Sequence, residues 1–496
     1  MPLVRVSAAS TLTAGCNGAQ TGTLFINAEV EPSVIANPVS PANIIGAWQQ
    51  DRWSNGGAQG LMLAATFDGG QNWTRASVPF SRCTGGNTGN GGDLDRATDP
   101  WVSMSPDGIA YALSLSFSGA TLMPGSASAM IVSRSADGGL TWSTPITLIR
   151  DGAQFFNDKG SITADSNDAH FVYAVWDRLD AANNGPSWFA RTIDGGASWQ
   201  PARGIYDPGA GNQTIGNQIV ALPGGAILNV FTEIDVGGGR VTSTIRAIRS
   251  TDHGDTWAAP VTVADLLAVG TLNPDTGVPV RDGSDVPALA VDASGVVYVA
   301  WQDARFSSGQ RDAIALSRST DGGATWSTPV RVNSIPATAA FTPTVHVRSD
   351  GVIGVTYYDF RNNTSDSATL PTDYWIATST DALTFREAHL SGPFDLDLAP
   401  DAGGAFLGDY QALTSSGGDF LPFFVQTNAG GVGNRTDVFI GFGRMLAAAH
   451  AESAQTGENA GEIAAPVQMT SDWQRRLQQR IERRLEQRVP DSTTRH

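Results

Sequence analysis

A short motif that returns along the chain constrains the fold more than any other feature. It has the form Ser/Thr-x-Asp-x-Gly-x-Thr/Ser/Asn-Trp, and successive copies lie roughly 60 residues apart, a period typical of propeller or solenoid folds. Each copy follows an alternating stretch such as "AIALSR" and precedes another such as "TPVRV", so we predict a hairpin turn. The Asp residues of the full copies and of one shortened copy are Asp68, Asp137, Asp194, Asp252, Asp321 and Asp381.

The residue types in the motif suit a structural role. The Asp side chain accepts backbone N–H bonds within a turn, Gly adopts positive φ, and Trp packs under the sheet. The 56 glycines, 13 tryptophans and 16% charged residues also favour many short strands joined by tight turns. We therefore assign the repeated motif to the scaffold and look for the chemistry elsewhere.

The strands between the turns predict an all-β fold, a seven-bladed β-propeller, with six blades as the alternative. The unit around Asp321 has the strands "DVPALAVDA", "GVVYVAWQD", "DAIALSRS" and "STPVRVN". The last unit begins at Leu407 with three strands and no motif, and the N-terminal "PLVRVS" is an unattached strand that supplies a fourth. Because ring closure removes exposed sheet edges, we expect one propeller domain over residues 1–446, closed by the N-terminal strand.

The C-terminal region differs in character from the propeller. We expect a flexible linker over residues 447–469 and a basic amphipathic helix over residues 470–489, capped by Thr470 or Ser471 and ended by Pro490. A lone helix of this length is marginal in water. We therefore expect it to dock on its own propeller, on a second copy of the chain (slightly favoured) or on another protein. Its apolar stripe consists of Trp473, Leu477, Ile481 and Leu485.

Charge and cysteine content restrict the surroundings of the protein. The net charge of -17 argues against a nucleic-acid partner, and no apolar run is long enough to span a bilayer. The first residues lack the apolar segment of a secretion signal, and we expect an extracellular or cell-envelope protein whose signal is absent from this chain. Cys16 and Cys83 either form one disulfide or stay as two buried thiols.

A second recurrence marks the face opposite the repeated turns, which we call the front face. It carries the starts of the first strands and the ends of the second strands of each unit. The second strands end at Asp51 and Arg52, Asp177 and Arg178, Glu233, Asp303 and Arg305, and Asp359 and Arg361. The first strands open near Glu31, Asp99, Asp158, Asp285 and Asp409. These groups form either blade-to-blade ion pairs or, in an asymmetric subset, a functional site.

The repeated motif resembles the Asp-box (BNR repeat) of the sialidase (neuraminidase) superfamily, over about residues 60–390. The resemblance implies a secreted glycoside hydrolase of exo-α-sialidase type. Such an enzyme acts on terminal acidic sugars by a retaining mechanism, with a tyrosine nucleophile activated by a glutamate. Arginines would bind the sugar carboxylate. The family's Phe/Tyr-Arg-Ile-Pro signature is missing, and only "LVRVS" with Arg5 is similar to it.

The resemblance also points to particular residues. "GDYQAL" at residues 408–413 resembles the nucleophile segment, which makes Tyr410 the predicted nucleophile, with Glu233 as its base. "WQDARFSSGQRD" resembles a segment in which an arginine is followed by a catalytic aspartate, here Arg305 and Asp312. The predicted substrate-binding residues are Arg305, Arg361, Arg178, Arg52 and Asp409.

The alternative function is a non-catalytic propeller that binds glycans or proteins on its front face. In that case Tyr410 is a wedge in the ring, and Asp409 pairs with a neighbouring arginine. In either case we expect a glycan or glycoconjugate partner and no cofactor. The segment from Asp93 to Asp99 is acidic enough for calcium but lacks the ordered spacing of a calcium loop, and no His/Cys group has zinc spacing.

Overall fold

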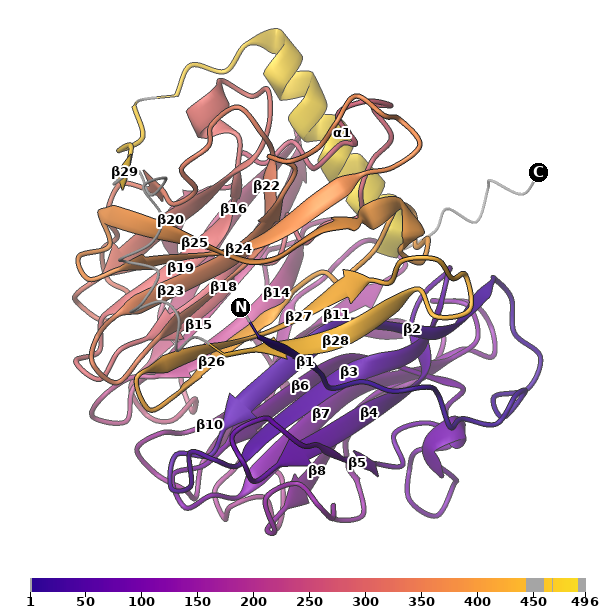
Figure 1. The fold of residues 1–496 in the computed structure, drawn as a ribbon. Helices are drawn as coiled ribbons and strands as arrows, with labels where there is room; N and C mark the ends of the chain where they lie inside the picture. The colour runs from indigo at the N-terminus through magenta and orange to yellow at the C-terminus, as the bar shows by residue number, and fades with distance from the viewer. Residues whose placement is uncertain (1, 443–458, 466, 489–496) are drawn as a thin grey trace.

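The computed structural model describes residues 2–442, 459–465 and 467–488, and within them it shows an all-β fold with one C-terminal α-helix (Figure 1). Strands adjacent in sequence pair antiparallel in four-stranded units, an arrangement consistent with a β-propeller. The first units contain β2 (Leu24–Ala36), β3 (Ile44–Trp53), β4 (Ala58–Thr66) and β5 (Thr74–Ser77), then β6 (Arg96–Met104), β7 (Ala110–Ser118), β8 (Ala127–Ser135) and β9 (Ile146–Asp151). They are followed by β10 (Phe155–Ala164), β11 (Val172–Asp180), β12 (Ser187–Thr192) and β13 (Arg203–Tyr206), then β14 (Gln213–Ala221), β15 (Ile227–Gly237), β16 (Arg240–Ser250) and β17 (Val261–Asp265). The later units contain β18 (Ala288–Val291), β19 (Val297–Asp303), β20 (Ala313–Ser319) and β21 (Val330–Arg331), then β22 (Ala340–Val347), β23 (Ile353–Asp359), β24 (Pro371–Ser379) and β25 (Thr384–Asp395).

The first strand of the chain lies in the last unit. That unit contains β26 (Ala412–Ser416), β27 (Asp419–Thr427) and β28 (Thr436–Gly441), and β1 (Leu3–Arg5) pairs antiparallel with β28. Val6, which follows β1, is buried in the same core cluster as Phe423 and Ile440. The Ser7 hydroxyl donates to Asp437 at 2.7 Å. The N-terminal segment is therefore held in the last unit by backbone pairing with β28, by apolar packing and by a buried hydrogen bond.

The repeated motif forms the turn between the third and fourth strands of a unit, as the sequence predicted. In the turn after β8, Asp137 Oδ1 accepts the backbone N–H of Thr141 at 2.9 Å and the hydroxyl of Ser135 at 2.8 Å. The indole N–H of Trp142 donates to the carbonyl of Gly139 at 3.2 Å. The Asp side chain thus fixes the turn, while the Trp covers it. Related hydrogen bonds recur at Asp68, Asp194, Asp252, Asp321 and Asp381.

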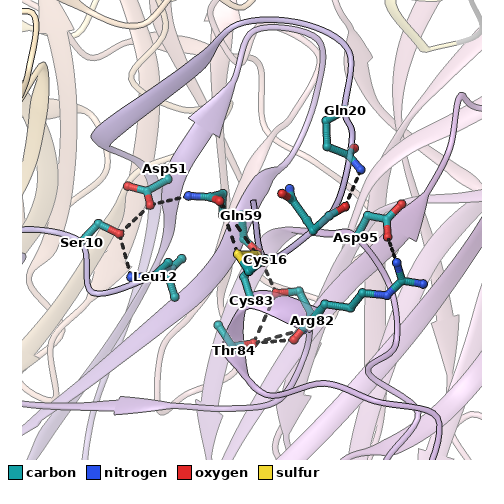
Figure 2. Close-up of a disulfide and its surroundings, with 12 residues drawn as sticks. Ser10, Leu12, Cys16, Gln20, Asp51, Gln59, Arg82, Cys83, Thr84 and Asp95 are labelled. Atoms are coloured by element: carbon teal, nitrogen blue, oxygen red, sulfur yellow. Dashed lines mark hydrogen bonds and ion pairs between the residues drawn. A yellow bond between two sulfur atoms is a disulfide. The ribbon is translucent and has the colours of Figure 1, made fainter. Parts of the chain in front are cut away.

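Cys16 and Cys83 form a disulfide, so the alternative of two free thiols is wrong. The bond joins the loop before β2 to the short 3₁₀ turn after β5, across 67 positions of sequence. Figure 2 shows Gln59 beside the two sulfur atoms, with its side chain directed to Asp51, to which it donates at 2.8 Å. The disulfide therefore ties the N-terminal loop to the unit that contains β2 and β5.

The C-terminal helix α1 (Ser471–Arg488; yellow in Figure 1) docks on its own chain. Its Trp473, Leu477 and Ile481 are buried in one cluster with Ile215, Ile234, Leu267, Val269 and Ala304. The apolar stripe is therefore covered by the propeller itself, while association with a second copy stays a prediction. Neither α1 nor any other helix among the described residues is long and apolar enough to cross a bilayer.

Part of the predicted linker is ordered against the propeller. Residues 447–458 and 466 of that linker lie outside the described residues. After residue 458, β29 (Asn459–Ala460) pairs antiparallel with β25. The backbone N–H of Arg331 donates to the carbonyl of Glu462 at 3.1 Å, and that of Ala464 donates to Pro329 at 3.0 Å. This stretch thus forms hydrogen bonds with the backbone groups at the outer edges of β21 and β25. The composition of the linker alone does not predict that interaction.

Candidate functional site

The first strands of several units carry the same irregularity near the front face. In β2, β6, β10 and β22 the pairing register slips, and one residue at the slip has a positive φ. In three of these strands a proline follows, and proline has no N–H to give to the ladder. A bulge of this kind re-aims a side chain. The residues at the bulges are Glu31 (φ 52°), Asp99 (φ 52°), Lys159 (φ 47°) and Thr342 (φ 49°).

Lys159 joins three carboxylates that come from different units. Its Nζ lies 2.7 Å from Asp409, 3.2 Å from Asp99 and 3.5 Å from Glu31. Its backbone N–H also donates to Asp99, at 3.0 Å. Burial disfavours the charged amine, but the carboxylates of Asp409, Asp99 and Glu31 outweigh it and raise the pKa of Lys159. The lysine is therefore a fixed cation at the centre of the cluster.

Asp409 is the carboxylate with the most cationic partners in this cluster. Besides Lys159, its Oδ2 lies 3.1 Å from Arg281 and 3.5 Å from Arg484. Burial alone would favour the neutral acid, but the charges of Arg281, Lys159 and Arg484 hold the pKa of Asp409 well below its usual value. Asp409 thus serves as an internal anion that positions the surrounding cations.

Asp99 has the opposite electrostatic character. Burial, together with the nearby carboxylates Glu31, Asp158 and Asp409, raises the pKa of Asp99 to about 7, although Lys159 opposes the shift. Its carboxyl group therefore keeps a proton at a pH at which an ordinary aspartate is ionised. A carboxyl group in that state can give up a proton or accept one, which is the property of a general acid or base.

An open pocket of about 320 Å³ lies over the cluster. Arg52 enters it from the end of β3 and Arg281 from the loop before β18, and both guanidinium groups lie over the ring of Phe406, at 4.9 and 4.5 Å. Burial and the neighbouring charge of Arg281 lower the pKa of Arg52 to about 10. Two adjacent cations, of which Arg52 is buried and Arg281 partly buried, favour an anionic ligand. The other charged residues that line the pocket are Glu31, Asp99, Asp158, Lys159 and Arg484.

Helix α1 brings two further arginines to this region. Arg480 pairs with Asp285, and Arg484 lies 3.6 Å from Asp285 and 3.5 Å from Asp409. Arg476, one turn earlier, donates to the carbonyls of Gly309 and Gln310, both at 2.9 Å. The helix is therefore held by its apolar stripe and, along its length, by polar contacts to the front face.

Tyr410, the predicted nucleophile, is buried directly beneath the cluster. Its hydroxyl donates to the carbonyl of Pro100 at 3.2 Å, and its ring packs against Trp101 with centroids 5.2 Å apart. Burial and the carboxylates of Glu31 and Asp99 raise the pKa of Tyr410 well above its usual value. Tyr410 lines a second, narrower cavity of about 190 Å³ and not the pocket described above.

Glu233, the predicted base, does not contact Tyr410. It accepts a hydrogen bond from Tyr206 and lies 3.1 Å from Arg246, which is on the neighbouring strand β16. Glu31 is instead the glutamate whose charge acts on Tyr410. The structure thus brings Tyr410 together with Glu31 and Asp99, but not with Glu233.

Three of the four predicted clamp arginines are held in ion pairs with carboxylates of the chain. Arg178 binds Asp151 through two nitrogens, Arg305 pairs with Asp303, and Arg361 pairs with Asp359 and Glu387. Arg178 and Arg361 also stack on tryptophan rings. Only Arg52, of these four, lines the pocket.

Asp312 holds the loop on which α1 rests. Its carboxylate accepts the backbone N–H groups of Val269 at 2.8 Å and Gly270 at 2.9 Å. Burial and the charge of Asp282 raise the pKa of Asp312 to about 7. The residue resembles Asp99 in burial and pKa, but it does not line the pocket.

Sequence reasoning missed Lys159, Arg281 and Arg484 as members of the site. The sequence did contain a signal for Lys159. Three units have an X-Pro pair at the same place in their first strand, and Lys159-Gly occupies the equivalent place in its own unit. The three pairs are Glu31-Pro, Asp99-Pro and Thr342-Pro. Arg281 lies in a loop without a repeat, so no comparison between units reveals it. Within the described residues, no group of three or more His, Cys, Asp or Glu side chains could hold a metal ion.

No family model matches the sequence, and no curated protein matches it. Solved structures with a similar fold include a protein of unknown function from Dyadobacter fermentans (14% identity, 85% of this chain and 96% of that chain, TM-score 0.46). A Hadza microbial sialidase (15%, 81% and 76%, 0.45) and the α-L-arabinofuranosidase Arb93A of Fusarium graminearum (12%, 72% and 92%, 0.45) are also similar. At these identities the similarity concerns the fold alone, and the assignment of a β-propeller fold to this chain rests on its own antiparallel four-stranded units.

Proposed function

We propose that the pocket binds a terminal acidic sugar and that the protein hydrolyses its glycosidic bond. The observation that carries the proposal is the combination of Arg52 and Arg281 with the carboxyl group of Asp99 in one pocket. Paired guanidinium groups bind a carboxylate through parallel hydrogen bonds. The pocket volume of about 320 Å³ is at the small end for ligand sites and suits a single terminal residue of a glycan.

In this proposal, Asp99 protonates the leaving oxygen. A glycosidase needs a carboxylic acid that keeps its proton near neutral pH, and a second group that attacks the anomeric carbon or activates water. Glu31 and Asp158 also line the pocket and are the carboxylates available for the second role. Tyr410 stays the predicted nucleophile of a retaining mechanism, although its hydroxyl must first leave the Pro100 carbonyl and reach the pocket, which Tyr410 does not line.

A matched pair of variants tests the assignment. Asp99→Asn and Asp312→Asn each remove a buried carboxyl group whose pKa is raised to about 7, but only Asp99 lines the pocket. With aryl α-N-acetylneuraminide and aryl glucuronide substrates, we expect kcat to fall at least ~100-fold in Asp99→Asn and to stay near wild type in Asp312→Asn. Equal losses would count against Asp99 as the acid. Tyr410→Phe, and NMR of the first-formed anomer, test the retaining tyrosine mechanism.

The second candidate is a non-catalytic propeller that binds acidic glycans. It is favoured by the internal hydrogen bond of Tyr410 and by the internal ion pairs of Arg178, Arg305 and Arg361. Saturable binding of N-acetylneuraminate or glucuronate without turnover of any aryl glycoside would select this function over hydrolysis.

We also infer that the ring has seven blades and that the protein works in an oxidising compartment. The first inference is supported by the strand order, in which β1 completes the unit of β26 to β28. A crystal structure with six units in the ring would contradict it.

The Cys16–Cys83 disulfide supports an extracellular or cell-envelope location, because such bonds persist where thiols are not kept reduced. Fractionation of the native host, with immunodetection of the protein, tests that location.

A further inference from the structure

We propose that Arg484 of the C-terminal helix binds the anionic ligand, so that α1 is a wall of the pocket and ligand binding and helix docking strengthen each other. This inference rests on the proposed function for its saccharide ligand. Its basis in the structure is the position of Arg484, which lines the pocket although it lies more than 40 residues beyond the last propeller strand.

The helix leaves the pocket open. With α1 docked, about 320 Å³ remains between Arg484, Arg52, Arg281 and Lys159. A helix that acted as a plug would fill this space with its own side chains. Here the bulky residues Trp473, Leu477 and Ile481 are buried in a separate apolar cluster. Arg484 thus forms part of the boundary of the pocket and leaves room for a ligand.

The arginines of the pocket have unused hydrogen-bond donors. The residues Arg52 and Arg484 are only 2% and 8% exposed, and the Nε of each has no hydrogen-bond partner among the described residues. Arg484 donates one long hydrogen bond, of 3.5 Å from Nη2 to Asp409, and its Nε lies 3.6 Å from Asp285. Buried donors without partners are costly, and both of these donors belong to arginines that line the pocket.

The charge balance of the pocket depends on the helix. Without α1, the carboxyl groups around the pocket outnumber the cations, and an acidic ligand would be repelled. When Arg480 and Arg484 are included, the cations equal the carboxyl groups in number. Protonation of Asp99 then leaves the pocket with a net positive charge. The carboxyl groups are Glu31, Asp99, Asp158, Asp285 and Asp409, and the cations are Arg52, Lys159, Arg281, Arg480 and Arg484.

The test uses the full chain and three variants. Arg484→Gln removes the charge from the pocket, whereas Arg483→Gln removes an exposed charge from the same helix. Gly309→Ala places a methyl group against Trp473 and releases the helix with Arg484 intact. Calorimetry measures the affinity for N-acetylneuraminate and glucuronate, and hydrogen–deuterium exchange of residues 471–488 reports docking.

We expect Arg484→Gln and Gly309→Ala to weaken binding at least ~10-fold, and Arg483→Gln to change it less than ~2-fold. Arg484→Gln should keep its helix protected from exchange, which separates loss of the charge from loss of docking. Unchanged affinity in Arg484→Gln would overturn the proposal. Tighter binding in Gly309→Ala would overturn it too, because the helix would then be an inhibitor that the ligand displaces.

A second probe separates this inference from the proposed function. If the wild type binds no acidic saccharide, the proposed function fails, and sulfate then tests the anion site by itself. At constant ionic strength, replacing chloride by sulfate should increase the protection of residues 471–488 in wild type and Arg483→Gln, but not in Arg484→Gln. The same response in all three proteins, or none in the wild type, would refute the role of Arg484.

Discussion

The contact between Trp473 and Gly309 offers a direct way to measure how firmly α1 is held. Gly309 has a φ of +81°, and a Cβ atom placed there would lie 2.1 Å from Cγ and 2.4 Å from Cδ2 of the indole. Gly309 is itself buried, and the indole is only 2% exposed, so the indole has no room to give way. Gly309→Ala should therefore expel Trp473 from its groove.

The magnitude follows from the area that the indole buries. A buried tryptophan covers about 150–250 Å², which at about 25 cal/mol per Å² corresponds to about 4–6 kcal/mol. If half of this contact is lost, docking weakens by about 2–3 kcal/mol, or roughly 30- to 150-fold in the docking equilibrium. Arg476 would also lose its bonds to the carbonyls of Gly309 and Gln310.

Gly351→Ala is the matched control. Gly351 has a φ of +83°, and a Cβ atom there would meet nothing within 4 Å. Both variants carry the cost of alanine in a left-handed conformation, about 1–2 kcal/mol, but only one of them touches the helix. Hydrogen–deuterium exchange of residues 471–488 should accelerate in Gly309→Ala and stay at the wild-type rate in Gly351→Ala. Equal exchange in the two variants would refute the packing argument.

Three further predictions concern stability. Removal of residues 2–8 exposes an edge of β28 and should lower the free energy of unfolding by about 3–5 kcal/mol in urea titrations; a loss below ~1 kcal/mol would contradict the closure. Replacement of Cys16 and Cys83 by serine should cost about 4 kcal/mol, given the closed loop of 67 positions, and an unchanged urea midpoint would disprove it. Because folding raises the pKa of Asp99 from 3.8 to about 7, its contribution to stability is complete below pH ~4 and lost as pH rises through 7. Asp99→Asn should remove that part of the pH dependence, and identical pH profiles would argue against the shift.

The repeated turns were predictable because their structure is decided locally. At Asp137, the side chain bonds to groups two residues before it and four after it, so the sequence alone contains every partner. The apolar stripe of α1 was predictable for the same reason, since helical periodicity defines one face. Periodicity does not say which surface covers that face, and for this reason the groove around Val269 and Ala304 could not be foreseen.

The centre of the front face depends on long-range register, and here the sequence was less informative. The bulge in β10 presents Lys159 to the acidic cluster, while the sequence drew attention to the neighbouring Asp158. Likewise, the ends of the second strands supplied many Asp and Arg residues, but only folding shows that Arg305 and Arg361 pair within their units. Arg484 joins the site from the far end of the chain, and no spacing rule connects it to Asp409.

The pairing of β1 with β28 has a consequence for biosynthesis. β1 is made long before its partner β28, which ends at Gly441, so the segment waits while more than 430 residues are made. At about 5–20 residues per second this takes roughly 20–90 s. During that time an exposed strand is a risk for pairing with other chains, and natural edge strands are kept short and charged to limit it. β1 fits that description, with three residues that include Arg5. A nascent chain of this protein would therefore remain an open ring until β28 has been made, and proteases or chaperones in the cell would meet that open form first.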